Sequence, residues 1–241
     1  KRKTVIKTRY IYSFSGLYGD VLDVDNAVSF PDDLLRQYAK NGINGVWIQA
    51  VLYKLQSFAF GEEISAGWEN RLANLNNLIE RAKRYGIKVY LYINEPRGMP
   101  CSFFDKYPKI KGSMYHDGLA CLCTSSNEVR SYLENALYSL CKAVPELGGF
   151  FNISMSENLT HCYSRSDIKD NEFCPVCRNK NKEDVTADVI TIMANAVYKA
   201  NPEMKFFVNS CSLTQNGVQF FLQSIQNLGN NTFGVRIGQS A

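Results

Sequence analysis

Short runs of β-branched and aromatic residues alternate along this chain with longer amphipathic stretches. Each run is nearly continuous in apolar residues, which is typical of a strand in a sheet that is covered on both faces. The runs predict six strands, over residues 9–14, 45–52, 88–93, 149–155, 205–210 and 232–237. The chain is therefore expected to alternate strand and helix from end to end.

The amphipathic stretches carry start and stop signals of helices. Pro31 stands where a first helical turn would begin, and Gly42 stands beyond the expected end of the same helix. The spacing of Ser125 and Glu128 fits a capping box at the start of another helix. Apolar residues three or four apart complete the pattern. The expected helices cover about 31–41, 70–85, 125–145, 183–200 and 218–228.

Strand, helix and strand in this order predict parallel strands joined by right-handed crossovers, which is an α/β fold. Gly16 and Gly19 follow the first strand without the glycine fingerprint of a dinucleotide-binding loop. Long polar stretches follow the third and fourth strands instead. We therefore predict a (β/α)8 TIM barrel over residues 1–241 as a single domain. Because six strands are found where eight are needed, we expect a barrel that is incomplete in this chain, as a piece of a longer protein.

The amino-acid composition excludes several classes of protein. Of the 241 residues 45% are hydrophobic and 12% aromatic, and 27 lysines and arginines face 23 aspartates and glutamates. These values exclude a disordered chain and disfavour a nucleic-acid binder. No apolar run is long enough to span a membrane. Since His116 and His161 are the only histidines, the composition disfavours a catalytic triad that depends on histidine.

Two glutamates follow predicted strands directly, Glu95 after the third and Glu157 after the fourth. In a parallel barrel the carboxyl ends of the strands meet at one face, where the chemistry takes place. Cleavage of a glycoside needs a protonated carboxyl group that donates to the leaving oxygen. Glu157 is our candidate general acid, because burial at an apolar strand end would raise its pKa. The structural alternative is that Glu157 caps a turn or pairs with an arginine.

Other polar residues near the same face are candidates for binding a sugar. Glu95 could be catalytic, could contact substrate, or could form a turn and a salt bridge with Arg97. We expect Glu95, Arg97, Asn158 and Gln49 to contact an oligosaccharide or glycoside substrate.

The stretches YLYINEPR at 90–97, SENLTHC at 156–162 and CPVC at 174–177 resemble a little-characterised group of bacterial TIM-barrel proteins. That group is similar to the glycoside hydrolases, nearest to the β-N-acetylhexosaminidase-like barrels. The resemblance covers about residues 9–209 and implies hydrolysis of a glycan in a bacterium, in the cytoplasm, in the periplasm or after secretion. It also implies that Glu157 is the acid at the end of the fourth strand.

One position departs from the hexosaminidase pattern, in which an aspartate precedes the acid and holds the substrate acetamide. Ser156 stands at that position here. Substrate-assisted cleavage of an N-acetyl sugar is therefore disfavoured. A second hypothesis follows, in which the chain is a carbohydrate-binding barrel without catalytic activity.

A cluster of sulfur and imidazole donors follows Glu157. His161, Cys162, Cys174 and Cys177 are ligand types of a structural zinc ion, and Cys121 or Cys123 could replace one of them. Disulfides and unbound thiols are the alternatives. Four protein ligands would close the site, so zinc would fasten the loop and would not activate water. A zinc hydrolase is the less favoured reading, and no organic cofactor is expected.

Overall fold

The computed structural model describes residues 8–13, 16, 20–23, 26–155, 158–210 and 234–236. Three expectations fall outside these residues. They are the candidate acid Glu157, its neighbour Ser156 and the helix over about 218–228.

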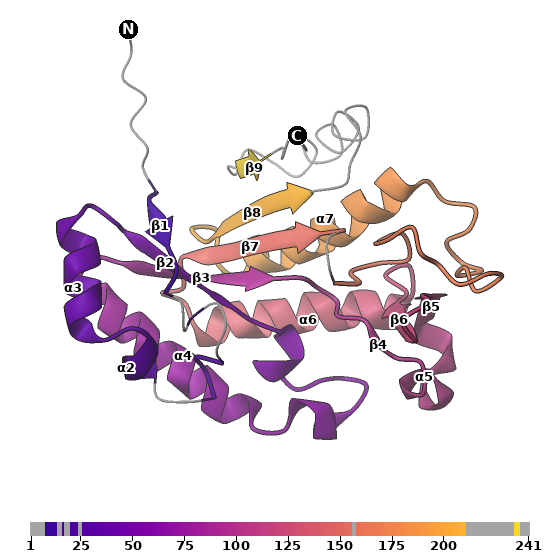
Figure 1. The fold of residues 1–241 in the computed structure, drawn as a ribbon, viewed down its shortest axis with the longest axis horizontal. Coiled ribbons are helices and arrows are strands. Elements are labelled where there is room, and N and C mark those ends of the chain that lie inside the picture. Colours follow the sequence, from indigo (N-terminus) through magenta and orange to yellow (C-terminus); the bar gives the residue numbers. More distant parts are fainter. Residues whose placement is uncertain are drawn as a thin grey trace, which may run out of the picture.

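Six parallel strands form the main sheet, in the order β1-β2-β3-β7-β8-β9 (Figure 1). The strands are β1 (Tyr10–Ile11), β2 (Gly45–Gln49), β3 (Lys88–Ile93), β7 (Gly149–Ser154), β8 (Lys205–Ser210) and β9 (Gly234–Arg236). All six expected strands are confirmed, and β3 and β8 have the expected bounds. Strand β2 ends earlier than expected, because the chain turns into a 3-10 helix at Leu52.

Helices connect the strands. The long ones are α3 (Asp32–Lys40), α4 (Trp68–Lys83), α6 (Asn127–Ala143) and α7 (Lys182–Ala200), and the short ones are α2 (Asn26–Ser29), α5 (Phe103–Lys106), η1 (Leu52–Lys54), η2 (Glu62–Ser65) and η3 (Pro108–Ile110). The expected capping box of Ser125 and Glu128 is wrong, because the residue before α6 is Ser126. Ser126 precedes α6, and its hydroxyl donates to Glu128 Oε2 at 2.6 Å without capping a backbone N–H. Within the described ranges no helix is both long and apolar enough to cross a membrane.

The two faces of the main sheet differ. One face supplies apolar side chains such as Val46, Leu91 and Phe150 to a core shared with α3, α4, α6 and α7. The other face carries aromatic rings that contact one another, and some of these contacts join strands that are not neighbours, such as Tyr10 in β1 and Phe151 in β7. The rings are Tyr10, Trp47, Tyr90, Tyr92, Phe151 and Phe207. Strands that follow one another in sequence order, with helices on one face, are the arrangement of a barrel and not of a doubly wound sheet. In the described part of the chain β1 and β9 do not pair, so closure into eight strands stays a prediction.

A second, antiparallel sheet follows β3, and the sequence pattern did not predict it. Its strands are β4 (Met99–Pro100), β5 (Lys111–Met114) and β6 (Leu119–Leu122), in the order β4-β6-β5. Tyr115 pairs with Ile168 in the connection between β7 and α7. The small sheet and that connection therefore lie against each other, beyond the carboxyl ends of β3 and β7 (Figure 1).

Candidate functional site

A pocket of about 180 Å³ lies at the carboxyl edge of the main sheet. The segments after β2, β3 and β7 and the start of β6 form its wall, and its lining residues are Val51, Tyr53, Arg97, Gly98, Leu119, Asn158 and Leu159. This is the edge at which parallel barrels carry their chemistry. Two of the four expected substrate ligands, Arg97 and Asn158, therefore lie in one pocket.

A chain of hydrogen bonds fixes these two side chains. Arg97 Nη1 donates to Asn158 Oδ1, and Asn158 Nδ2 donates to Asn94 Oδ1 at 3.2 Å. Asn94 is fully buried, and its Nδ2 donates to the Ile153 carbonyl at 2.9 Å. Asn94 thus ties the pocket to β7, a role that the sequence signals only by its position directly after β3. Arg97 Nε is buried and has no hydrogen-bond partner among the described residues, so a donor is left in the pocket wall.

Glu95 lies beneath this wall and is only 1% exposed. Its Oε1 accepts a hydrogen bond from the Leu52 backbone N–H at 2.7 Å, at the first residue of η1. Its Oε2 has no hydrogen-bond partner in the part of the chain that the structure describes. Burial raises the pKa of Glu95 to about 7, against the opposing effect of the Leu52 N–H. Glu95 therefore holds the segment after β2 in place, and contact of Glu95 with substrate stays a prediction.

The remaining candidates lie apart from the pocket or outside the description. Gln49 is exposed at the end of β2, paired in register with Tyr92, and does not line the pocket. Glu157 precedes Asn158 directly in the chain. A role for Gln49 in binding and for Glu157 in catalysis both stay predictions.

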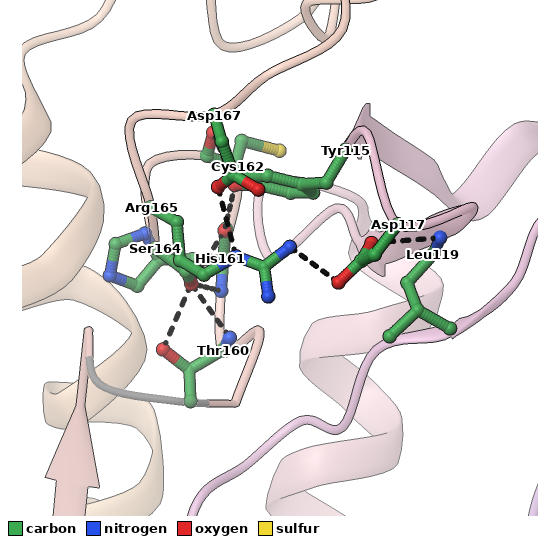
Figure 2. Close-up of polar contacts among 9 residues, drawn as sticks. All are labelled: Tyr115, Asp117, Leu119, Thr160, His161, Cys162, Ser164, Arg165 and Asp167. Carbon is green, nitrogen blue, oxygen red and sulfur yellow. Dashed lines mark hydrogen bonds and ion pairs between the residues drawn. The ribbon is translucent and has the colours of Figure 1, made fainter.

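Polar contacts hold residues 160–167 of the connection between β7 and α7 (Figure 2). Ser164 Oγ accepts hydrogen bonds from the Thr160 N–H at 2.7 Å and from the His161 N–H at 2.8 Å. Arg165 pairs with Asp117 at 2.6 Å, in the turn between β5 and β6. These contacts join the connection to the small sheet.

Four buried thiols gather where the connection meets the small sheet. The Sγ atoms of Cys123, Cys162, Cys174 and Cys177 lie within 4.8 Å of one another, a group that could hold a metal ion. Three of them are expected ligands, and the fourth comes from the residue that follows β6.

His161, the other expected ligand, is not part of this group. Its Nδ1 accepts a hydrogen bond from the Tyr163 N–H at 3.1 Å, and its Nε2 lies 3.2 Å from Thr186 Oγ1 on α7. Burial lowers the pKa of His161 to about 3. Both ring nitrogens are thus engaged with protein atoms, and the fourth thiol of the group belongs to Cys123, one of the two cysteines that the sequence offered as a replacement ligand.

Comparison with known proteins gives matches among solved structures only. No protein-family model and no curated protein sequence matches the chain. PbGH5A, a glycoside hydrolase family 5 enzyme from Prevotella bryantii B14, is 11% identical with a TM-score of 0.55, over 96% of this chain and 63% of that one. A trimodular GH5_4 subfamily endoglucanase is 13% identical with a TM-score of 0.53, over 95% and 38%. The β-mannanase of the blue mussel Mytilus edulis is 12% identical with a TM-score of 0.51, over 84% and 58%.

Because the sequence identities are only 11–13%, these matches show a similarity of fold and nothing more. The chain has the fold of glycoside hydrolase TIM barrels and spans less than two thirds of the length of each of these enzymes. A variant of PbGH5A has been solved in complex with the xyloglucan tetradecasaccharide XXXGXXXG. The expected α/β class with a parallel sheet is confirmed, whereas the complete eight-stranded barrel, a relation to hexosaminidases and a bacterial source stay predictions.

Proposed function

We propose that the protein is a glycoside hydrolase that cleaves an oligosaccharide or glycoside, with Glu157 as the general acid. The observation that carries this proposal is the pocket at the carboxyl edge of the sheet, where Arg97 contacts Asn158, the residue after Glu157. The barrel fold shared with endoglucanase and mannanase structures supports it, as does the oligosaccharide bound by PbGH5A.

The proposed reaction breaks the bond between the anomeric carbon and the leaving oxygen. The carboxyl proton of Glu157 passes to the leaving oxygen, and water supplies the hydroxyl group that ends on the anomeric carbon. The remaining proton of the water replaces the one that Glu157 gave up. Arg97 and Asn158 would orient the sugar hydroxyls through N–H donors and an amide oxygen. The reaction needs no organic cofactor, and we propose that any zinc ion in the protein is structural.

Turnover of a panel of glycosides by the protein and its Glu157→Gln variant tests this role. Loss of a general acid costs about 10²- to 10⁴-fold in rate. We expect that loss on alkyl glycosides, whose leaving oxygen must be protonated. We expect a much smaller loss on dinitrophenyl glycosides, whose leaving group departs as an anion. Glu203→Gln, at an exposed carboxyl group after α7, is the matched control and should leave turnover unchanged.

Two results would contradict the proposal. Equal losses on both kinds of glycoside would mean that Glu157 does not act as an acid. Absence of turnover in both forms, with sugar binding retained, would favour the carbohydrate-binding barrel.

A further inference from the structure

We infer that Cys123, Cys162, Cys174 and Cys177 bind one structural zinc ion through four thiolates, and that this ion fastens the connection between β7 and α7 to the small sheet. Cys123 follows β6, and the other three cysteines belong to the connection. All four are at most 1% exposed. A buried group of four soft sulfur donors is a ligand set typical of structural zinc.

The spacing of the sulfur atoms fits ligands around one ion. Cys123 Sγ lies 3.6 Å from Cys174 Sγ and 3.7 Å from Cys177 Sγ. Tetrahedral zinc with Zn–S bonds of about 2.3 Å places its sulfur ligands about 3.8 Å apart. A disulfide would need sulfur atoms about 2.05 Å apart. These thiols, all four within 4.8 Å of one another, are therefore spaced as zinc ligands and not as disulfide partners.

The surroundings of the thiols suit a negatively charged zinc–thiolate group. Cys121 Sγ donates to Cys162 Sγ at 3.7 Å, and Ser125 Oγ lies 3.4 Å from Cys177 Sγ. The Lys180 ammonium group lies 3.0 Å from Ser125 Oγ. The Ser125 hydroxyl group therefore links this positive charge to Cys177 Sγ. Such polar partners outside the ligand set orient the ligands and stabilise the thiolates.

Close packing of the β5 backbone against the cluster also supports a structural metal site. A Cβ atom on Gly112 in β5 would lie 2.4 Å from Cys121 Sγ and 2.9 Å from Cys162 Sγ. Only a residue without a side chain allows β5 to approach these sulfur atoms so closely. The backbone of β5 thus packs against the buried sulfur atoms, and four thiolate ligands would leave no open coordination position for a reacting water.

The ion would also position the wall of the candidate pocket. Leu159 lines the pocket and packs in the same apolar cluster as the four cysteines. Cys162 lies three residues further along the connection. Loss of the ion would therefore loosen Leu159 and Asn158 together. This consequence rests on the proposed function, whereas metal binding itself does not.

Metal content of the purified protein is the first test. We expect close to one zinc ion per chain by elemental analysis. Cys123→Ser and Cys177→Ser should each weaken zinc binding by more than about 100-fold, beyond the effect of losing a partner outside the ligand set. Cys101→Ser, at a partly exposed thiol outside the cluster, is the control that should keep the ion. His161→Asn should also keep it, because the asparagine oxygen can still accept from the Tyr163 N–H.

Cobalt substitution of the wild-type protein gives a second readout that needs neither a variant nor activity. Tetrahedral cobalt with four thiolates absorbs strongly in the visible range, with additional sulfur-to-metal charge-transfer bands in the near ultraviolet. Three results would overturn the inference: a chain without zinc, iron in place of zinc, or zinc that stays in Cys123→Ser and is lost in His161→Asn. A zinc-loaded protein that cleaves no glycoside would leave the inference standing and would contradict only the proposed function.

Discussion

Replacement of Glu95 by glutamine tests how its buried carboxyl group contributes to stability. The side chain is 1% exposed, its Oε1 accepts from the Leu52 N–H at 2.7 Å, and its Oε2 has no partner among the described residues. Glutamine keeps the accepting oxygen and the shape and cannot become charged. The substitution therefore removes the ionisation of Glu95 and little else.

The magnitude follows from the pKa of Glu95, which burial raises from 4.5 to about 7. Between these two pH values the unfolded chain has lost the proton and the native protein still holds it. Because the native state then binds more protons, the free energy of unfolding falls as the pH rises through this window. A shift of this size corresponds to about 3 kcal/mol, at about 1.4 kcal/mol per unit. The wild-type protein and Glu95→Gln should thus be equally stable near pH 4, and the variant should be about 3 kcal/mol more stable at pH 8.

Urea unfolding followed by tryptophan fluorescence measures the difference between the two proteins at each pH. Taking the difference removes the contribution of every other titrating group. Glu203→Gln, at an exposed site, should match the wild-type protein within about 0.5 kcal/mol at every pH. A stability difference that does not change with pH, or a variant that is less stable at pH 8, would refute the reasoning. If Glu95 also contacts substrate, the stabilised variant will bind or turn over glycosides less well.

Two further substitutions test the frame of the site. Gly149→Ala should lower the free energy of unfolding by about 2 kcal/mol or more in urea titrations, because Gly149 has a φ of 139° and a Cβ there would lie 1.9 Å from the Lys205 carbonyl oxygen; unchanged stability would mean that β7 and β8 do not pair as described. Asn94→Ala removes the amide that joins the Ile153 carbonyl to Asn158, and should cost about 1–3 kcal/mol in the same assay and weaken sugar binding; full sugar affinity would show that the hydrogen-bond chain does not hold the pocket.

The central strands of the main sheet could be predicted from sequence because they pack against helices on one face and carry aromatic rings on the other. Both faces select apolar residues, so β3 is apolar throughout after Lys88, and β8 has the apolar run of residues 206–208. Strand β2 was expected to be longer, because Leu52 continues the apolar run although it begins η1. An apolar residue indicates that a position is buried but not whether it lies in a helix or in a strand. Leu52 is buried in a 3-10 helix as deeply as it would be in a strand.

The small sheet could not be predicted in the same way. Its strands are short, and β4 contains Pro100, which weakens the strand signal. Strand β5 begins Lys-Gly-Ser, where Gly112 is selected for its contact with sulfur atoms and not for strand propensity. The contacts that stabilise these strands come from the distant connection after β7, so a pattern read along the chain does not contain them.

The fourth ligand stayed open in the sequence between His161 and its alternatives Cys121 and Cys123, for the same physical reason that this sheet was not predicted. Cysteines close in sequence are recognised by spacing, which is why Cys174 and Cys177 were assigned together. Cys123 reaches them only because β6 passes beside the connection, where the Cys174 N–H donates to Ser113 Oγ on β5 at 3.1 Å. His161 precedes Cys162 directly, and its ring turns to Thr186 on α7 while the thiol turns to the cluster. The donor types could thus be read from the sequence, whereas the membership of the site depends on which strands the fold places side by side.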